Sequence, residues 1–297
     1  MLLNSLFHSL SVNRRGRDFV VGDIHGHKAL LEALLALVNF NASRDRLIGL
    51  GDLIDRGPVS RSMLEMLRDE PWFHSIRGNH EAMFKGSIDD RGVQRVWRLN
   101  GGKWADPMSK KEMCELASIV DGMPLSLTVD LADGRKIGLV HAELHVNHPW
   151  EALASLSNDV DIDPIDDFTS TIQSAALWGR TRIRVWETSV NAESFAEVAP
   201  HRLAAFRRAM KPIEGLDLLV AGHTVLPAGE PVRASNMLWI DTGCGYEKGR
   251  LTLVEPLLGN YWQAHYVDEG SGEIVLRDAG SLPPASELPA QVLSHEG

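Results

Sequence analysis

The stretch RGNHE, residues 77–81, places a guanidinium, an amide and an imidazole directly after an apolar run that reads as a buried strand. Comparable polar groups follow other apolar runs, in the segments GDIHG, GDLIDRG, VHA and GHT. Their carboxylate, imidazole and amide donors, without any thiolate, suit Mn, Fe, Zn or Mg ions. The candidate metal ligands are Asp23, His25, Asp52, Asn79, His141 and His223.

This set of donors is too large for one ion with an open position, but it suits two ions that share one carboxylate. Two metals about 3.5–4 Å apart can clamp both oxygens of an in-line displacement at phosphorus. Asp52 follows the middle strand of the three that open the chain, so we expect it to be the shared carboxylate. A water held between two cations would have a strongly lowered pKa and would be hydroxide near neutral pH.

The elements that must position these groups alternate along the first half of the chain. Apolar runs predict strands, and amphipathic runs predict helices, in the order 17–22, 27–38, 45–50, 60–70 and 72–76. This βαβαβ order predicts a parallel sheet with right-handed crossovers. The part after residue 122 reads as β-rich. Because loops that leave the carboxyl ends of strands lie along one edge of such a sheet, the five polar clusters should converge on one crevice.

Composition narrows the class of protein. The 297 residues carry a net charge of -10, which argues against nucleic acid and against anionic membranes as partners. Two cysteines make no disulfide scaffold, so we expect a reducing, cytoplasmic location. No apolar run approaches the ~20 residues that span a bilayer. The first ten residues lack a leading basic region, which argues against a signal peptide. The oligomeric state is left open.

The chain reads as one catalytic domain over residues 14–270, with a helical insert at about 88–122. The acidic stretch 158–167 reads as an exposed loop. Residues 271–297 are rich in Ser, Pro, Gly and Ala, and we expect a weakly ordered C-terminal tail.

The five blocks, in this order, resemble the metallophosphoesterases of the phosphoprotein phosphatase type, above all the bacterial and lambda-phage serine/threonine protein phosphatases. NGGKW, LWGR and WIDTG also match that branch, and the resemblance spans roughly residues 18–256. One such tripeptide alone would be weak support, whereas five blocks in order, each after a predicted strand, are specific. The resemblance implies the α/β class and an α/β/β/α sandwich, in which central mixed sheets are flanked by helices.

The resemblance also implies a role for each matching residue. Asp23, His25 and Asp52 would hold one divalent ion, and Asp52, Asn79, His141 and His223 the other. His80 would be the general acid, with Asp55 as its partner. Arg56, Arg77 and Arg180 would grip the phosphoryl oxygens. Mn²⁺ is the expected ion, with Fe, Zn, Mg or Co as alternatives.

The implied function is hydrolysis of phosphoserine and phosphothreonine monoesters in proteins, by in-line attack of a metal-bridging hydroxide. The residue types fit this chemistry independently of any resemblance. Arginine offers a planar fork that pairs with two phosphate oxygens. An imidazolium beside a carboxylate keeps its proton at neutral pH and can protonate a poor leaving group.

Other interpretations remain open at the level of sequence. A hydrolase of dinucleoside polyphosphates, of the Ap4A type, shares most of these blocks, and a binding scaffold could keep the fold without the reaction. Asp23 and Asp52 could cap turns or helices, and His141 and His223 could be core histidines. Arg180 could be a surface residue.

For three further residues near the motifs, the sequence gives less specific indications. Trp97 and Trp104, in the helical insert, read as packing residues. Glu143, in HAEL, could hydrogen-bond a ligand or face the substrate.

Overall fold

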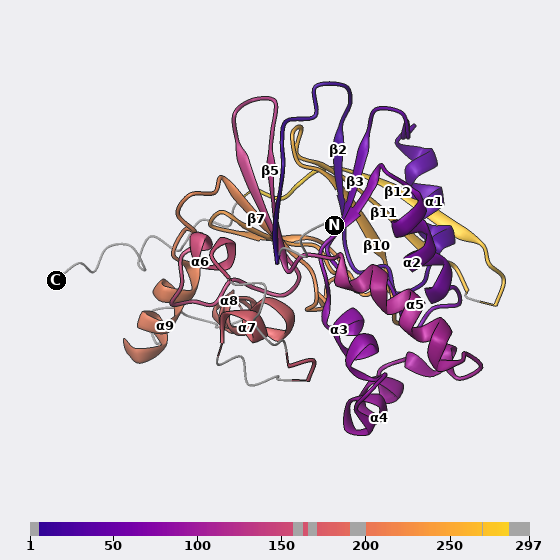
Figure 1. Cartoon of the computed structure of the whole chain (residues 1–297). Helices are drawn as coiled ribbons and strands as arrows, with labels where there is room; N and C mark the ends of the chain where they lie inside the picture. The colour runs from indigo at the N-terminus through magenta and orange to yellow at the C-terminus, as the bar shows by residue number, and fades with distance from the viewer. Residues whose placement is uncertain (1–5, 157–162, 166–170, 191–199, 269, 285–297) are drawn as a thin grey trace.

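The structure, a computed structural model, describes residues 6–156, 163–165, 171–190, 200–268 and 270–284 (Figure 1). Most of the acidic stretch 158–167, which we predicted to be an exposed loop, lies outside these residues. Among the helices of the described residues, none is long and apolar enough to cross a membrane.

The predicted βαβαβ unit is confirmed. Its elements are β2 (Asp18–Val21), α1 (Lys28–Leu37), β3 (Arg46–Gly49), α2 (Ser60–Asp69) and β4 (Phe73–Ser75). β2 pairs with β3, and β3 with β4, in parallel. All four residues of β2 are buried, as expected for a strand of a parallel sheet covered on both faces.

Two six-stranded sheets form the centre of the molecule. One sheet has the order β12-β11-β10-β2-β3-β4, where the C-terminal strands are β10 (Leu251–Glu255), β11 (Asn260–Tyr266) and β12 (Ile274–Ser281). The other has the order β1-β5-β6-β7-β9-β8. Its strands are β1 (Phe7–Leu10), β5 (Ser126–Asp130), β6 (Lys136–Val140), β7 (Leu218–Ala221), β8 (Val232–Ala234) and β9 (Met237–Trp239). β5 and β6 pair antiparallel as a hairpin, in the part of the chain after residue 122 that we predicted to be β-rich.

Helices cover the outer face of each sheet, and the result is the expected α/β/β/α sandwich (Figure 1). The remaining helices are α3 (Asn79–Gly86), α4 (Arg91–Leu99), the 3-10 turn η1 (Gly102–Ala105), α5 (Lys110–Asp121), α6 (Trp150–Ala154), α7 (Ile172–Trp178), α8 (Thr181–Val190) and α9 (Pro200–Met210). Between the sheets, an apolar layer joins Val20 and Ile48 of one sheet to Leu139, Val220 and Leu238 of the other.

Both ends of the described chain extend further into the fold than expected. β1 lies before the predicted boundary at residue 14 and pairs in parallel with β5. The expectation of a weakly ordered tail from residue 271 is wrong for β12, which pairs with β11 over seven positions. Most β12 side chains are exposed, so backbone hydrogen bonds hold a strand that the apolar pattern does not reveal. Residues 285–297 of the predicted tail lie outside the described residues.

If β1 belongs to the fold, Leu6 should matter although it precedes the predicted domain. Leu6 is 7% exposed, and its carbonyl accepts from the backbone N–H of Leu125 at 2.9 Å. We expect Leu6→Ala to lower the free energy of unfolding by about 2–5 kcal/mol, because it empties a buried volume. Leu99→Ala, at a position 80% exposed, is the control and should change it by less than about 0.5 kcal/mol. Denaturant titration measures both, and equal effects would exclude β1 from the cooperative unit.

Candidate metal centre

The predicted site residues meet where strands of both sheets end. Asp23 and His25 follow β2, Asp52 follows β3, and Asn79 and His80 begin the helix after β4. His141 follows β6, and His223 follows β7. All of these side chains are buried, although they lie in loops and at a helix start. The convergence that the sequence predicts at one edge is therefore what the structure contains.

Close backbone packing brings the loops after β3 and β4 together. Gly78 touches the Asp52 loop so closely that a Cβ there would clash with Oδ1 of Asp52. Glu81, which is fully buried on α3, binds the backbone of the same loop. Its carboxylate accepts from the backbone N–H groups of Asp52 (2.8 Å), Leu53 (2.8 Å) and Ile54 (3.3 Å). Burial raises the pKa of Glu81 to about 7.

This network shows that Glu81 does more than support its own helical turn. Its oxygen Oε2 does accept from Gly78 N–H at 2.9 Å, at the start of that helix. The larger part of its bonding goes to another loop, and Glu81 therefore fixes the backbone that carries Asp52.

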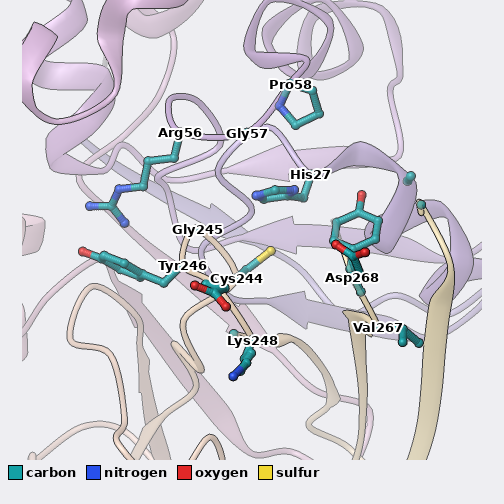
Figure 2. Close-up of a pocket in the computed structure, with 15 residues that line it drawn as sticks. His27, Arg56, Gly57, Pro58, Cys244, Gly245, Tyr246, Lys248, Val267 and Asp268 are labelled. Atoms are coloured by element: carbon teal, nitrogen blue, oxygen red, sulfur yellow. The ribbon is translucent and has the colours of Figure 1, made fainter. Parts of the chain in front are cut away.

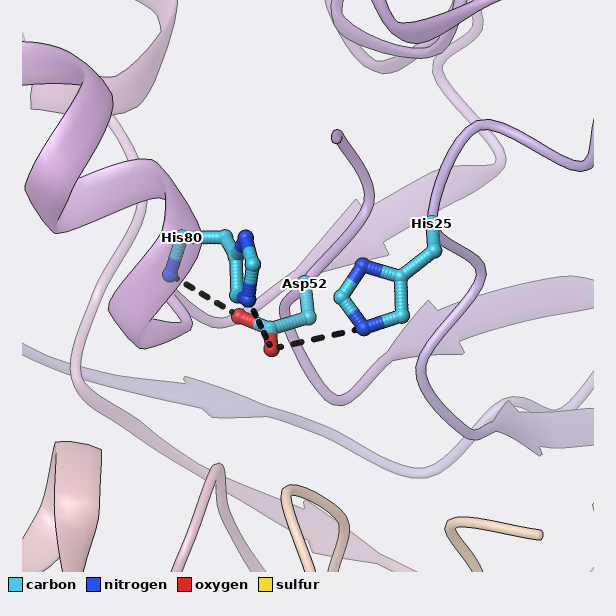
Figure 3. A group of neighbouring side chains, drawn as sticks. All are labelled: His25, Asp52 and His80. Atoms are coloured by element: carbon cyan, nitrogen blue, oxygen red, sulfur yellow. Dashed lines mark hydrogen bonds and ion pairs between the residues drawn. The ribbon is translucent and has the colours of Figure 1, made fainter. Parts of the chain in front are cut away.

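Asp52 is the centre of the cluster. Its Oδ2 lies 3.8 Å from Nε2 of His25 and 3.8 Å from Nε2 of His80, and its Oδ1 accepts from the backbone N–H of His80 at 3.0 Å (Figure 3). On the other side, Oδ1 lies 3.4 Å from Nε2 of His141. Burial alone would raise the pKa of Asp52, but the surrounding imidazoles hold it well below its ordinary value.

Two triads of potential ligands share this carboxylate. One is His25, Asp52 and His80, and the other is Asp52, His141 and His223; within each, the ligand atoms lie within 4.8 Å of one another. Asn79 completes the second group, since its side-chain amide lies 2.9 Å from Nε2 of His141 and 3.2 Å from Nδ1 of His223. A carboxylate common to two ligand groups is the arrangement that a bridged pair of ions requires.

The imidazoles are oriented as ligands. Nδ1 of His25 lies 2.9 Å from the carbonyl of Ile54, and Nδ1 of His141 lies 2.7 Å from that of Leu50. A ring that donates Nδ1–H to a carbonyl keeps the lone pair on Nε2, and these Nε2 atoms face Nη1 of Arg56 in His25 and the amide of Asn79 in His141. Burial lowers the pKa of His25, His141 and His223, which favours the neutral form that binds metal. Nε2 of His223 is buried without a hydrogen-bond partner among the described residues.

The buried carboxylates of the centre carry negative charge that has to be compensated by cations. Asp23 accepts from the backbone N–H of His223 at 3.0 and 3.2 Å. Burial, together with the charges of Asp241 and Asp52, raises the pKa of Asp23 well above its ordinary value. Asp241 also lies near this edge, and burial raises its pKa to about 6. Three buried carboxylates this close repel one another, and divalent cations would relieve that repulsion.

His80 and Asp55 form a buried pair beside the cluster. Nδ1 of His80 lies 2.6 Å from Oδ2 of Asp55. Burial disfavours the imidazolium, but the charge of Asp52 and the hydrogen bond to Asp55 raise the pKa of His80 above its ordinary value. The pair has the geometry expected of a proton donor with its supporting carboxylate.

Two of the three predicted arginines lie at the mouth of the cluster. Nη1 of Arg56 is 2.7 Å from Nε2 of His25, and its Nη2 is 3.2 Å from Nε2 of His80. The guanidinium stacks on Tyr246 at 4.5 Å and borders an open cavity of about 1090 Å³ (Figure 2). Arg180 is half-buried, and burial lowers its pKa while the charges of Asp52 and Asp241 act in the opposite direction.

The prediction that Arg77 contacts phosphate is wrong in this structure. Its side chain is 6% exposed, and Nη2 donates to the backbone carbonyls of Val120 (2.9 Å) and Met123 (3.2 Å). Arg77 therefore ties the end of α5 to the start of α3. The motif RGNHE identifies the loop, but it does not say which way the first side chain turns.

Glu143 also differs from its sequence interpretation. Instead of facing a ligand, its carboxylate accepts from the backbone N–H groups of Thr181 (3.1 Å) and Arg182 (2.8 Å). It thereby binds the N-terminus of α8, directly after Arg180, where a negative charge is favourable. Trp97 and Trp104 were missed as parts of the site, since both indoles donate to Asp55.

The backbone of the site is unusual. Five non-glycine residues of the cluster and its loops have left-handed φ angles. They are His25 (46°), Asp52 (49°), Asp55 (74°), Arg56 (65°) and His223 (65°). This conformation is uncommon for residues with a side chain, and it clusters at functional sites.

Comparison with known proteins agrees with this geometry. Residues 19–227 match the family model of the calcineurin-like phosphoesterases. The chain is 31% identical over 228 residues to serine/threonine-protein phosphatase 2 of Salmonella typhimurium, covering 76% of this chain and 86% of that one. A symmetrical bis(5'-nucleosyl)-tetraphosphatase of Delftia acidovorans is 29% identical, but the match covers 48% of this chain and 50% of that one.

Among solved structures, a serine/threonine phosphatase from Saccharomyces cerevisiae has the same fold. The two align with a TM-score of 0.54 at 14% sequence identity, over 95% of this chain and 86% of that one.

Replacing the shared carboxylate tests the metal centre directly. We expect Asp52→Asn to lower the content of bound divalent metal from about two ions per chain to one or fewer, because an amide lacks the two anionic oxygens that bridge. Asp89→Asn, which alters a carboxylate that is 84% exposed, is the matched control and should keep the metal. Elemental analysis after loading with Mn²⁺ measures both variants. Full metal content in Asp52→Asn would contradict the assignment.

Proposed function

Because the chain belongs to the calcineurin-like phosphoesterase family, we propose that it is a metal-dependent protein phosphatase for phosphoserine and phosphothreonine. The observation that carries this proposal is the position of Asp52, whose carboxylate is common to two triads of potential ligands, one of which includes His80 of the His80–Asp55 pair. The similarity to a protein named serine/threonine-protein phosphatase 2 over most of both chains supports the same substrate class.

The residues present fit a pair of divalent ions. The donor set of such a site is present: buried carboxylates that repel one another, neutral imidazoles, and a buried nitrogen of His223 that has no hydrogen-bond partner within the described part of the chain. We assign Asp23, His25 and Asp52 to one ion, and Asp52, Asn79, His141 and His223 to the other. Bound ions would neutralise phosphate charge and lower the pKa of the attacking water.

The chain's own residues would bind the phosphate and supply a proton. Arg56 and Arg180, at the mouth of the cluster, can pair with the phosphoryl oxygens through their planar forks. His80 turns Nδ1 to Asp55, and its Nε2 faces the cluster, 3.8 Å from Asp52. The proton on Nε2 can pass to the serine or threonine oxygen as its bond to phosphorus breaks.

Further details of the proposal rest on composition and donor chemistry. Mn²⁺ is the proposed ion, since oxygen and imidazole donors without thiolate suit it. A cytoplasmic location fits a chain with only two cysteines, Cys114 and Cys244, which make no disulfide scaffold. The net charge of -10 argues against nucleic acid as a partner.

Removing the proposed acid should affect chemistry and leave metal binding intact. We expect His80→Asn to lower kcat on a phosphoserine peptide by about 10²–10⁴-fold, the usual contribution of a general acid. The pKa of His80 is raised, so the wild-type rate should hold above the ordinary histidine pKa and fall as the pH passes the raised value. That alkaline limb should be absent in His80→Asn. An unchanged turnover with normal metal content would refute the role of His80.

A comparison of substrates tests the substrate class. We expect kcat/KM for a phosphoserine peptide to exceed that for diadenosine tetraphosphate by at least about tenfold, because the relative named as a tetraphosphatase matches only half of the chain. The measurement uses chelated protein with and without added Mn²⁺, so that metal dependence is read from the same panel. A preference for diadenosine tetraphosphate would reverse the assignment, and no turnover of either substrate with Mn²⁺ bound would favour a binding scaffold.

A further inference from the structure

Both oxygens of the Asp55 carboxylate are occupied by three N–H groups from three elements. Oδ2 lies 2.6 Å from Nδ1 of His80 and accepts from Nε1 of Trp97 at 2.8 Å. Oδ1 accepts from Nε1 of Trp104 at 2.6 Å. Asp55 is fully buried, and its own backbone N–H donates to Oγ of Ser60 at 2.8 Å. The carboxylate therefore has one defined orientation.

The NGGKW motif explains how two indoles reach one carboxylate. Trp97 lies on α4, and Gly101 follows the helix with a left-handed φ of 112°. A Cβ on Gly101 would press on the backbone of Arg56, and one on Gly102 would clash with the indole of Trp97. Without side chains at these positions, the turn η1 folds back and brings Trp104 to the other oxygen of Asp55.

Packing alone accounts for only part of this arrangement. Trp97 and Trp104 contact each other and Phe84, with ring centroids 5.4 to 6.1 Å apart, as in an ordinary aromatic cluster. A buried indole N–H needs an acceptor, and a backbone carbonyl would serve. Here both indoles donate instead to the same carboxylate, and that carboxylate supports the proton donor of the site.

We propose that Trp97 and Trp104 are positioning residues for the general acid: their indole N–H groups fix Asp55, and Asp55 fixes the ring of His80. This inference rests on the proposed function, because it takes His80 as the acid. With Nδ1 bound to Asp55, the transferable proton is on Nε2, which faces the cluster. A small displacement of a catalytic group can cost about 10²-fold in rate, so its supporting carboxylate must be held firmly.

The proton balance of the hydrolysis step shows which substrates depend on the position of His80. Water forms a bond to phosphorus, the bond from phosphorus to the seryl oxygen breaks, and that oxygen takes the proton from Nε2 of His80. The attacking water releases one proton, which restores the imidazolium after the products leave. A seryl oxygen needs this proton, whereas a p-nitrophenolate leaves without it.

The experiment compares two leaving groups. We expect Trp97→Phe and Trp104→Phe each to lower kcat on a phosphoserine peptide by about tenfold, while kcat on p-nitrophenyl phosphate changes by less than about threefold. Trp150→Phe is the control: this side chain is buried like that of Trp97, and its indole donates to Thr128 Oγ1 at 3.3 Å, on the other sheet. It should not distinguish the two substrates. Trp104 is only partly buried, so its variant keeps the test possible if Trp97→Phe does not fold.

A second readout is independent of turnover. In the full chain, we expect Asp55→Asn to shift the indole N–H resonances of Trp97 and Trp104 in ¹⁵N-correlated NMR spectra and to leave that of Trp150 in place. Unshifted Trp97 and Trp104 resonances would show that the indoles do not bind Asp55 in solution and would overturn the inference.

The outcomes distinguish the positioning role of the two tryptophans from the proposed phosphatase function. If the wild type hydrolyses the phosphoserine peptide and His80→Asn does not, the proposed function stands. In that case, equal losses on both substrates in Trp104→Phe, or a phosphoserine rate within twofold of the wild type, would overturn the positioning role alone. If the wild type fails on the phosphoserine peptide, both proposals fall.

Discussion

A buried carboxylate, that of Asp52, lies against histidines that come from separate loops, and the site is built around this charge. A carboxylate so deeply buried would be costly without compensation. The imidazoles of His25, His80 and His141 face it from two sides, and the network of Glu81 holds its backbone. Because Asp52 is common to both ligand groups, any shift of its loop changes both halves of the centre at once.

The two sheets supply the frame for this contact. The sheet that contains β2, β3 and β4 brings the loops after these strands to one edge, and the sheet that contains β6 and β7 brings the ends of those strands to the same place. The apolar layer between the sheets fixes their relative position, since close-packed interiors transmit displacement. The chemistry at the edge is thus positioned by a core that contains none of the reactive groups.

The sequence predicts most of the architecture for a simple reason. Strands of a parallel sheet that are buried on both faces read as continuous apolar runs, and β2, β3 and β7 are of this kind. The apolar pattern does not reveal β1 and β12, because β1 is only partly buried and most β12 side chains are exposed; backbone pairing holds both strands in place. The metal-ligating types were predictable because each follows such a run.

The orientation of single side chains was not predictable in the same way. Arg77 turns to the carbonyls at the end of α5, and Glu143 turns to the start of α8, although both lie within motifs that mark the site. Trp97 and Trp104 lie 42 and 49 positions from Asp55, and nothing local in the chain links them to it. Such contacts depend on how the insert folds back, which a pattern of residue types does not encode.

The left-handed backbone at His25, Asp52, Asp55, Arg56 and His223 has a consequence for how this chain can change. Each such residue costs the native state on the order of 1 kcal/mol or more relative to glycine. At these positions, the residue type that would best stabilise the fold is therefore not the one that the site requires. Substitution of these residues by glycine would relieve the backbone strain but would also remove the side chains that form the site. A variant of this chain that is more stable for this reason would therefore be inactive.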